Sequence, residues 1–373
     1  MKTRVIFGGS FDPVTNAHID MAKKLAERFD EVVVVPTYIS PFKSGGASLD
    51  GEERLDLLNS ELNGIKNLTV SDIELSAHEP SYSYITAQKL TKDGVKLYFA
   101  IGSDGLDTLD KWARPDILAK TVTFYIVDRP YFKIDEKTLK RARETYDIEI
   151  ADFLGKEGSS ALLKASVAFS KEAEVVPSGV AKIIREKGLY RDYCYITERY
   201  DDLKIKASRV EHIYRVCKMA IILAKKAGVS TDKAIKASLM HDITKYLTDS
   251  ELLALGVTDF GENLPATCRH QITGAQVAKI LFGETDEEIL SAISAHTTGK
   301  ENMSALDKII FAADYIEDGR DFNGVEKIRE ITLENLNEGI KAIVINTVKY
   351  LENNGMEIAS ITKKLHDGYR SKK

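Results

Sequence analysis

The sequence is poor in cysteine, and this scarcity excludes several classes of protein. Its 373 residues include three cysteines, Cys194, Cys217 and Cys268, and no two of them form a CxxC pair. An odd number of widely spaced cysteines supports neither a disulfide framework nor a zinc ribbon. We expect three reduced thiols.

Long apolar runs and a net positive charge are also missing. No segment approaches the ~18 uninterrupted apolar residues of a membrane span. The opening MKTRVIFGGSFDP has an apolar run too short for a secretory signal. With a formal net charge of -5, the chain lacks the basic field that gathers a nucleic acid. We therefore expect a cytoplasmic protein with no nucleic-acid or membrane partner.

The length and the hydrophobic pattern indicate two domains of different class. A chain of this length exceeds one ordinary core. In its first half, short apolar runs alternate with helical stretches, which favours a Rossmann-like parallel sheet with helices on both faces. The later part has helical patterns alone. We predict an α/β domain over residues 1–195 and an all-α domain over residues 196–373. The expected strands are 4–7, 31–35, 96–101, 121–127 and 174–176.

A glycine turn follows the first expected strand. The segment GGSFDPVTNAH runs from Gly8 to His18, and a helical pattern comes next. A strand, a glycine turn and a helix N-terminus direct backbone N–H groups at a phosphate. His18, in the first helical turn, could donate to phosphate oxygens on which charge develops. A structural turn with a partly buried histidine is an equally weighted interpretation.

This segment resembles the signature of the nucleotidyltransferase superfamily, and about the first 192 residues resemble the bacterial nicotinate-nucleotide adenylyltransferases. The resemblance also rests on SPFK at 40–43, PSYS at 80–83, IGSD at 101–104 and DRP at 128–130. It implies adenylyl transfer from ATP, with its Mg²⁺, to nicotinate mononucleotide, a step of NAD biosynthesis. Besides a catalytic His18, the implied substrate-binding residues are Gly8, Gly9, Ser10, Phe11, Thr15, Lys43, Asp104, Trp112, Arg129, Ser159, Ser160 and Lys164.

Four signature positions carry other residues than the family pattern, namely Thr15, Ala17, Phe42 and Lys164. A β-carbon at Ala17 is expected to crowd adenine or distort the turn. Lysine at position 164 lacks the planar fork of arginine. A second hypothesis therefore stays open, in which the first domain is a degenerate nucleotide sensor that regulates the second.

The second half contains six candidate metal ligands on or beside apolar helical faces. A charged group on such a face needs partners, and a metal ion satisfies several at once. Isolated core histidines remain the favoured interpretation for any one residue, but not for the whole set with its adjacent His-Asp pair. The candidates are His212, His241, Asp242, His270, His296 and Asp314.

The order of these residues resembles the HD hydrolase superfamily, and most closely the bacterial symmetrical bis(5′-nucleosyl)-tetraphosphatases. The segments at 209–212, 239–246, 269–270, 295–299 and 313–322 carry the resemblance. It implies metal-dependent hydrolysis of diadenosine tetraphosphate to ADP at a di-iron centre. Lys245, one helical turn beyond His241, is expected to face the same pocket and hold the polyphosphate. The implied ligands are His212, His241, Asp242 and Asp314 for one metal, and Asp242, His270 and His296 for the other.

Several alternatives remain open from the sequence. The second domain could be a nucleotide phosphatase or phosphodiesterase of broader range. Arg320, with Asp318 and Asp321, is equally compatible with a solvated loop and with substrate contact. A homodimer and coupling between the domains are also left open.

Overall fold

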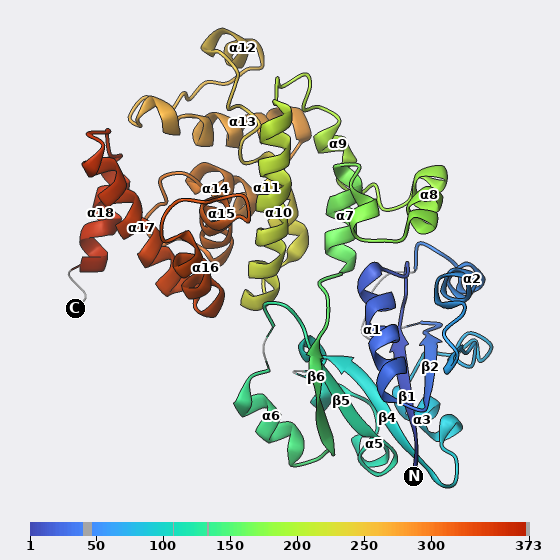
Figure 1. Ribbon diagram of the computed structural model, residues 1–373. Helices are drawn as coiled ribbons and strands as arrows, with labels where there is room; N and C mark the ends of the chain where they lie inside the picture. The colour runs from blue at the N-terminus through green and yellow to red at the C-terminus, as the bar shows by residue number, and fades with distance from the viewer. Residues whose placement is uncertain (40–46, 107, 133, 371–373) are drawn as a thin grey trace. The chain divides into compact units, whose positions relative to one another are not determined.

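The chain forms two compact units. The computed structural model describes residues 1–39, 47–106, 108–132 and 134–370 (Figure 1). The first unit contains Met1–Leu163 and Glu172–Tyr190, and the second contains Lys164–Lys171 and the residues from Arg191 onward. Helix α7 (Ser160–Ala168) thus begins in one unit and ends in the other. The domain bounds at residues 195 and 196 stay a prediction.

The first unit is built on a six-stranded, entirely parallel sheet in the order β3-β2-β1-β4-β5-β6. The order reverses between β1 and β4, and open parallel sheets bind ligands at the carboxyl ends of the strands at such a point. The strands are β1 (Lys2–Gly9), β2 (Glu31–Pro36), β3 (Leu68–Val70), β4 (Val95–Gly102), β5 (Thr123–Asp128) and β6 (Ile148–Leu154).

The predicted fold class is confirmed, with one wrong strand and two that were not predicted. The expected strands at 4–7, 31–35, 96–101 and 121–127 are β1, β2, β4 and β5. Residues 174–176 form no strand, because the chain leaves the short helix η2 (Glu172–Glu174) there and buries Val175 and Val176 without strand pairing. The unpredicted strands β3 and β6 are the two edges of the sheet.

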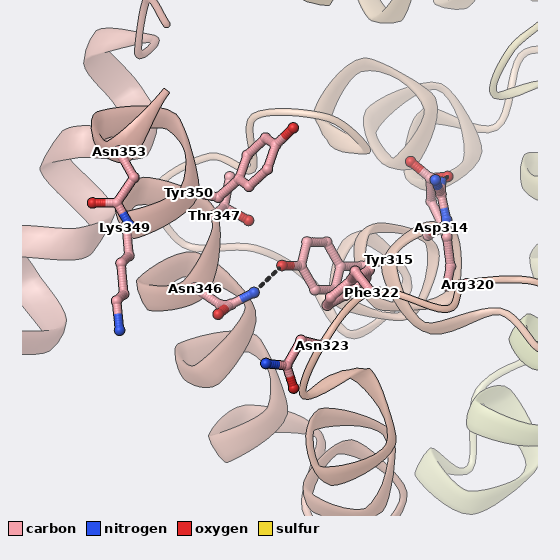
Figure 2. Close-up of a pocket in the computed structure, with 10 residues that line it drawn as sticks. All are labelled: Asp314, Tyr315, Arg320, Phe322, Asn323, Asn346, Thr347, Lys349, Tyr350 and Asn353. Atoms are coloured by element: carbon pink, nitrogen blue, oxygen red, sulfur yellow. Dashed lines mark hydrogen bonds and ion pairs between the residues drawn. The ribbon is translucent and has the colours of Figure 1, made fainter. Parts of the chain in front are cut away.

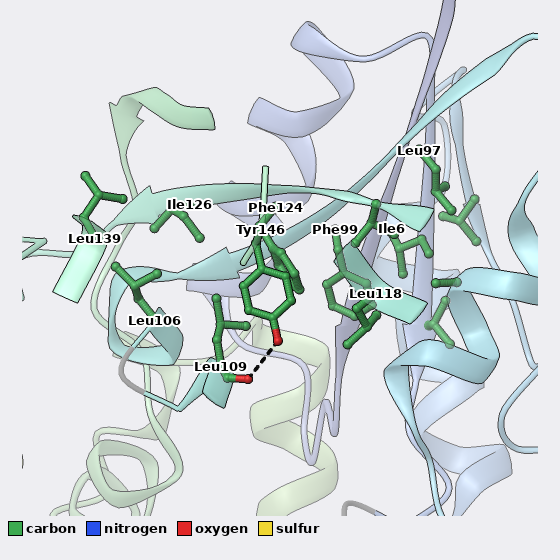
Figure 3. Close-up of a cluster of buried hydrophobic side chains, with 14 residues drawn as sticks. Ile6, Leu97, Phe99, Leu106, Leu109, Leu118, Phe124, Ile126, Leu139 and Tyr146 are labelled. Atoms are coloured by element: carbon green, nitrogen blue, oxygen red, sulfur yellow. Dashed lines mark hydrogen bonds between the residues drawn. The ribbon is translucent and has the colours of Figure 1, made fainter. Parts of the chain in front are cut away.

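Helices cover both faces of this sheet, which explains why its strands are almost continuously apolar. Helix α1 packs Ala22 and Leu25 on one face. Leu118 packs into the core cluster on the other, with Phe99 and Phe124 (Figure 3). The helices wholly in this unit are α1 (Asn16–Arg28), α2 (Gly51–Leu62), α3 (Ser83–Leu90), α4 (Ser103–Leu106), η1 (Leu109–Lys111), α5 (Pro115–Thr121), α6 (Glu136–Arg143), η2 and α8 (Ser178–Lys187).

The second unit consists of helices and their connecting loops, with no strand among its described residues. Its longest helix, α10, buries Ile213, Cys217 and Ile221 on one side, as its periodicity predicts. Within the described ranges, no helix combines the length and the apolar character needed to cross a membrane. The further helices are α9 (Cys194–Thr197), α10 (Ala207–Ala227), α11 (Thr231–Met240), α12 (Asp249–Ala254), η3 (Ala266–Cys268), α13 (His270–Phe282), α14 (Glu287–Ala295), α15 (Ala305–Ile316), α16 (Val325–Glu334), α17 (Leu336–Asn353) and α18 (Ser360–Arg370).

The core of the first unit provides a direct test of this packing. Leu118 is 0% exposed, so Leu118→Ala should lower the free energy of unfolding by about 2–5 kcal/mol. Leu154→Ala, at a side chain 54% exposed on β6, should cost less than about 1 kcal/mol. Urea unfolding followed by the fluorescence of Trp112, the single tryptophan, reports on this unit. Equal losses in the two variants would contradict the assigned core.

Candidate functional site

The six predicted metal ligands meet in the second unit. Each lies on a helix or at a helix end, so the backbone fixes where its side chain starts. They come from α10 (His212), the residues after α11 (His241 and Asp242), the first residue of α13 (His270), the residue after α14 (His296) and α15 (Asp314).

The carboxylate of Asp242 lies at the centre of this cluster. Its side chain is 3% exposed. Atom Oδ1 lies 3.1 Å from Nε2 of His270 and 3.6 Å from Nε2 of His296. Atom Oδ2 lies 3.4 Å from Nε2 of His241 and 3.9 Å from Nε2 of His212. Four imidazole nitrogens therefore point at one carboxylate.

Backbone carbonyl groups fix the tautomer of two of these imidazoles. Nδ1 of His241 lies 2.6 Å from the carbonyl oxygen of Ser238, and Nδ1 of His296 lies 2.7 Å from that of Ile293. Because a carbonyl oxygen only accepts, each Nδ1–H donates, and each neutral ring has its lone pair on Nε2. This is the arrangement that holds a histidine as a metal ligand.

The cluster fits divalent transition cations. Within the described residues, Nε2 of His212, Nε2 of His241 and Oδ1 of Asp242 are buried and make no hydrogen bond of normal geometry, although ionisable groups of the cluster lie close to each of them. Such atoms are costly to leave unsatisfied. The described residues include two sets of three in which the potential ligand atoms all lie within 4.8 Å of one another. The sets are His212, His241 and Asp314, and His241, Asp242 and His296. Imidazole and carboxylate donors together suit zinc, iron and similar ions.

Burial and charge adjust three of these groups, His241, Asp242 and His270, in the direction that metal binding requires. Burial lowers the pKa of His241, and it lowers the pKa of His270 to about 4. Burial alone would raise the pKa of Asp242, but the neighbouring histidines outweigh it and hold this pKa well below its usual range. These shifts favour the neutral form of the two imidazoles and the ionised form of the carboxylate, which are the forms that bind a metal ion.

Two residues that the sequence analysis did not assign support the ligands. Oε1 of the buried Glu317 lies 3.3 Å from Nδ1 of His212, and its Oε2 accepts from the backbone N–H of Gly319 at 2.6 Å. A guanidinium nitrogen of Arg209 lies 2.9 Å from Oδ2 of Asp242. Glu317 follows Asp314 by one helical turn, and that spacing was the available signal.

Lys245 lies beside the ligands, at a partly exposed position. Its Nζ is 3.1 Å from Nε2 of His270 and 3.9 Å from Oδ1 of Asp242. A cation at the edge of the cluster is suited to meet an anionic substrate.

In the first unit, the predicted glycine turn begins later than expected, because Gly8 and Gly9 are the last two residues of β1 and pair with β2. A β-carbon on Gly9 would approach the ring of Phe11 to 3.2 Å, and one on Gly8 would approach the ring of Phe99 to 3.3 Å. Phe11 itself has a left-handed backbone with a φ of 45°. Strands β1 and β4 pair only as far as Ile6 and Phe99, so the turn lies where the two strands separate.

Thr15 and His18 form a reciprocal cap at the start of α1. The hydroxyl oxygen of Thr15 accepts from the backbone N–H of His18 at 3.3 Å. The backbone N–H of Thr15 donates to Nδ1 of His18 at 3.0 Å. Because Nδ1 accepts, a neutral His18 has its proton on Nε2, which is the form that can donate to a phosphate.

Asp12 of the signature has a positioning role. Its carboxylate accepts from the backbone N–H groups of Ser48 at 2.8 Å and Leu49 at 3.0 Å, and from the hydroxyl group of Tyr190 at 2.8 Å. Arg54, which is buried, donates at 2.7 Å to the carbonyl oxygen of Ser10. These hydrogen bonds fix the backbone of the residues that follow Gly9.

The ends of the neighbouring strands β4 and β5 bring Asp104 and Arg129 together. Their charged atoms lie 3.2 Å apart. A β-carbon on Gly102 would lie 2.4 Å from the Asp104 carboxylate, so a larger residue at this position would displace that side chain. Trp112 packs edge-on against Phe99 and Phe124, with ring centroids 5.6 and 5.8 Å apart.

The remaining predicted residues lie around the start of α7. The hydroxyl group of Ser159 accepts from the backbone N–H of Leu162 at 3.2 Å, and Ser160 begins the helix. Lys164 lies in the part of α7 that belongs to the second unit, and its Nζ is 2.6 Å from Asp192. Lys43 lies outside the described residues.

Ala17, a departure from the signature, lies against a glycine. A β-carbon on Gly158 would come within 2.6 Å of that of Ala17. The absence of a side chain at position 158 therefore leaves room for the methyl group of Ala17.

Comparisons with known proteins match both units. A cytidylyltransferase-like family model matches residues 6–230, and an HD domain model matches residues 209–319. A Mycoplasma genitalium protein named "Probable nicotinate-nucleotide adenylyltransferase/Ap4A hydrolase" is 28% identical over 95% of this chain and 99% of its own length.

Relatives of single halves are also similar. A symmetrical bis(5′-nucleosyl)-tetraphosphatase of Halalkalibacterium halodurans is 38% identical, over 38% of this chain and 79% of its own. A probable nicotinate-nucleotide adenylyltransferase of Aliarcobacter butzleri is 37% identical, over 43% of this chain and 86% of its own.

The chain therefore belongs to the cytidylyltransferase-like family and joins that fold to an HD domain. It is an enzyme of the adenylyltransferase class fused to an HD-type hydrolase. Both resemblances inferred from the sequence are confirmed.

The cap at the start of α1 can be tested without a substrate. Thr15→Val removes the hydroxyl group and should destabilise the first turn by about 1 kcal/mol, whereas Thr15→Ser keeps the bond. Amide hydrogen exchange at His18 should become about fivefold faster in the valine variant alone. Equal exchange rates in the two variants would show that the hydroxyl group does not cap the helix.

Proposed function

We propose that the second unit hydrolyses diadenosine tetraphosphate symmetrically, and that the first unit transfers an adenylyl group from ATP to nicotinate mononucleotide. The observation that carries the hydrolase proposal is the convergence of four histidine side chains on the buried carboxylate of Asp242, with Asp314 3.0 Å from His212. The names of relatives that match each half support both proposed reactions.

In the hydrolase, the proposed ligands hold two divalent cations, with iron as the proposed metal. When bound, such ions lower the pKa of water and neutralise phosphate charge. The carboxylate of Asp242 and the Nε2 atoms of His241 and His296 present lone pairs, and Glu317 orients His212. Lys245 binds a phosphate at the edge of the cluster. One water breaks the bond between the second phosphate and its bridging oxygen, and two ADP molecules leave.

In the transferase, the backbone supplies most of the proposed chemistry. The glycine turn and the start of α1 direct N–H groups at the phosphates of ATP, which bring Mg²⁺ with them. His18 donates from Nε2 where negative charge develops, and Arg129 positions an anionic reactant. The phosphate oxygen of nicotinate mononucleotide attacks the first phosphorus of ATP, and pyrophosphate leaves.

One observation favours the alternative that the first unit is a nucleotide sensor. Lys164, which stands at a phosphate-binding position of the signature, is paired with Asp192 within the second unit. An assay of pyrophosphate release by the wild-type protein, supplied with ATP and nicotinate mononucleotide, distinguishes a transferase from a sensor. A sensor would bind ATP but release no pyrophosphate.

The metal proposal predicts more than one transition metal ion per chain after purification without chelator. His241→Ala should lose metal and abolish the release of ADP from diadenosine tetraphosphate, because it removes a ligand common to both candidate sets. His78→Ala, at an exposed residue of the first unit, is the matched control and should change neither. Metal analysis and product chromatography measure both effects. ATP and AMP as products would contradict symmetrical cleavage.

His18→Ala should slow adenylyl transfer by roughly 100- to 1000-fold, the usual cost of losing one donor that stabilises developing charge. Hydrolysis by the second unit should stay unchanged, because its ligands all lie in the other unit. Pyrophosphate release and ADP formation by the same preparation provide the two readings. A parallel loss of hydrolysis would show that the two activities are coupled.

A further inference from the structure

A cavity of about 610 Å³ in the second unit reaches the candidate metal centre. It lies between the end of α15, the loop that leads into α16, and α17 (Figure 2). Asp314 and Arg320 lie at one end of the view, and Lys349 and Asn353 of α17 lie at the other. Its volume is in the range of pockets that bind small molecules.

Asp314 belongs to both the metal centre and the cavity. Its Oδ1 lies 3.0 Å from Nε2 of His212, and its side chain is 23% exposed, against 3% for Asp242. Arg320 donates to the same Oδ1 at 2.9 Å. One end of a molecule bound in the cavity would therefore meet the Arg320 guanidinium group first and the proposed metal ligands beyond it.

The other walls suit a flat aromatic group. The rings of Tyr315 and Phe322 pack edge-to-face, with centroids 5.1 Å apart. The amide group of Asn346 donates to the hydroxyl group of Tyr315 at 2.7 Å, which fixes the phenol ring. Tyr350 keeps 59% of its surface exposed. Aromatic side chains stack on nucleobases, and asparagine amides can pair with a base edge.

We propose that this cavity binds the nucleoside at one end of a dinucleoside polyphosphate and that Arg320 holds the adjoining phosphate. The proposal rests on the proposed hydrolase function and names the part of the substrate that is recognised. A cavity with aromatic and amide walls and a cation at its metal end fits a base joined to a phosphate chain. A free inorganic phosphate would leave those walls unused.

Such a cavity would also set the position of cleavage. In the symmetrical reaction, two phosphates separate the nucleoside from the broken bond. With the nucleoside held in the cavity and the first phosphate on Arg320, the second phosphate would be the one presented to the metal ligands.

The test uses the full-length, metal-loaded protein with Tyr350→Ala and Phe322→Ala. Each change should raise the KM for diadenosine tetraphosphate by about 5- to 100-fold, the effect of losing one stacked base. The kcat and the metal content should stay within about twofold of the wild-type values. The affinity for ADP, measured by calorimetry, should fall by the same factor, while that for pyrophosphate should not change. Phe322→Tyr keeps a stacking surface and should restore both values.

Tyr195→Ala is the matched control, because this tyrosine is also exposed in the second unit and does not line the cavity. If Tyr350→Ala and Phe322→Ala bind ADP and diadenosine tetraphosphate as well as this control does, the proposal is overturned. A wild-type protein that binds ADP through these residues without hydrolysing the tetraphosphate would support the cavity and refute the proposed hydrolase function.

Discussion

The helical unit depends on the burial of one charged carboxylate, that of Asp242. An unpaired charge at such a position costs several kcal/mol, and removal of one partner of a buried pair is strongly destabilising. Four imidazole nitrogens and the Arg209 guanidinium group surround this carboxylate, and they come from helices far apart in the sequence. The packing of α10, α11, α13 and α14 therefore depends on the contacts that these helices make with the Asp242 carboxylate.

In the first unit, the proposed site consists mainly of backbone groups. Its glycine turn and the cap of α1 present N–H groups, and Asp12 is used to hold neighbouring loops through Ser48 and Leu49. Such a site depends on the positions of main-chain atoms more than on ionised side chains. This difference explains why the proposed metal ligands form a compact cluster, whereas the residues proposed for the transferase are spread over several loops.

The residues of the proposed hydrolase site could be picked out from the sequence because they stand on recognisable helical faces. His241 and Asp242 follow an apolar helical run, where charged groups need partners. The spacing of Glu317 from Asp314 was not enough to assign it from the sequence, because its burial depends on how α15 packs. In the first unit, Val175 and Val176 resemble a strand, but so short an apolar run does not distinguish a strand from a buried turn. The pairing of Lys164 with Asp192 also depends on tertiary structure, since α7 ends in the other unit.

Anomalous diffraction from crystals of the metal-loaded protein tests the central claim most directly. The account predicts two metal peaks, with the carboxylate of Asp242 between them and His212 and Asp314 on one side. A single peak that does not contact Asp242, or no peak while Arg209 and Lys245 keep their contacts with its carboxylate, would contradict it.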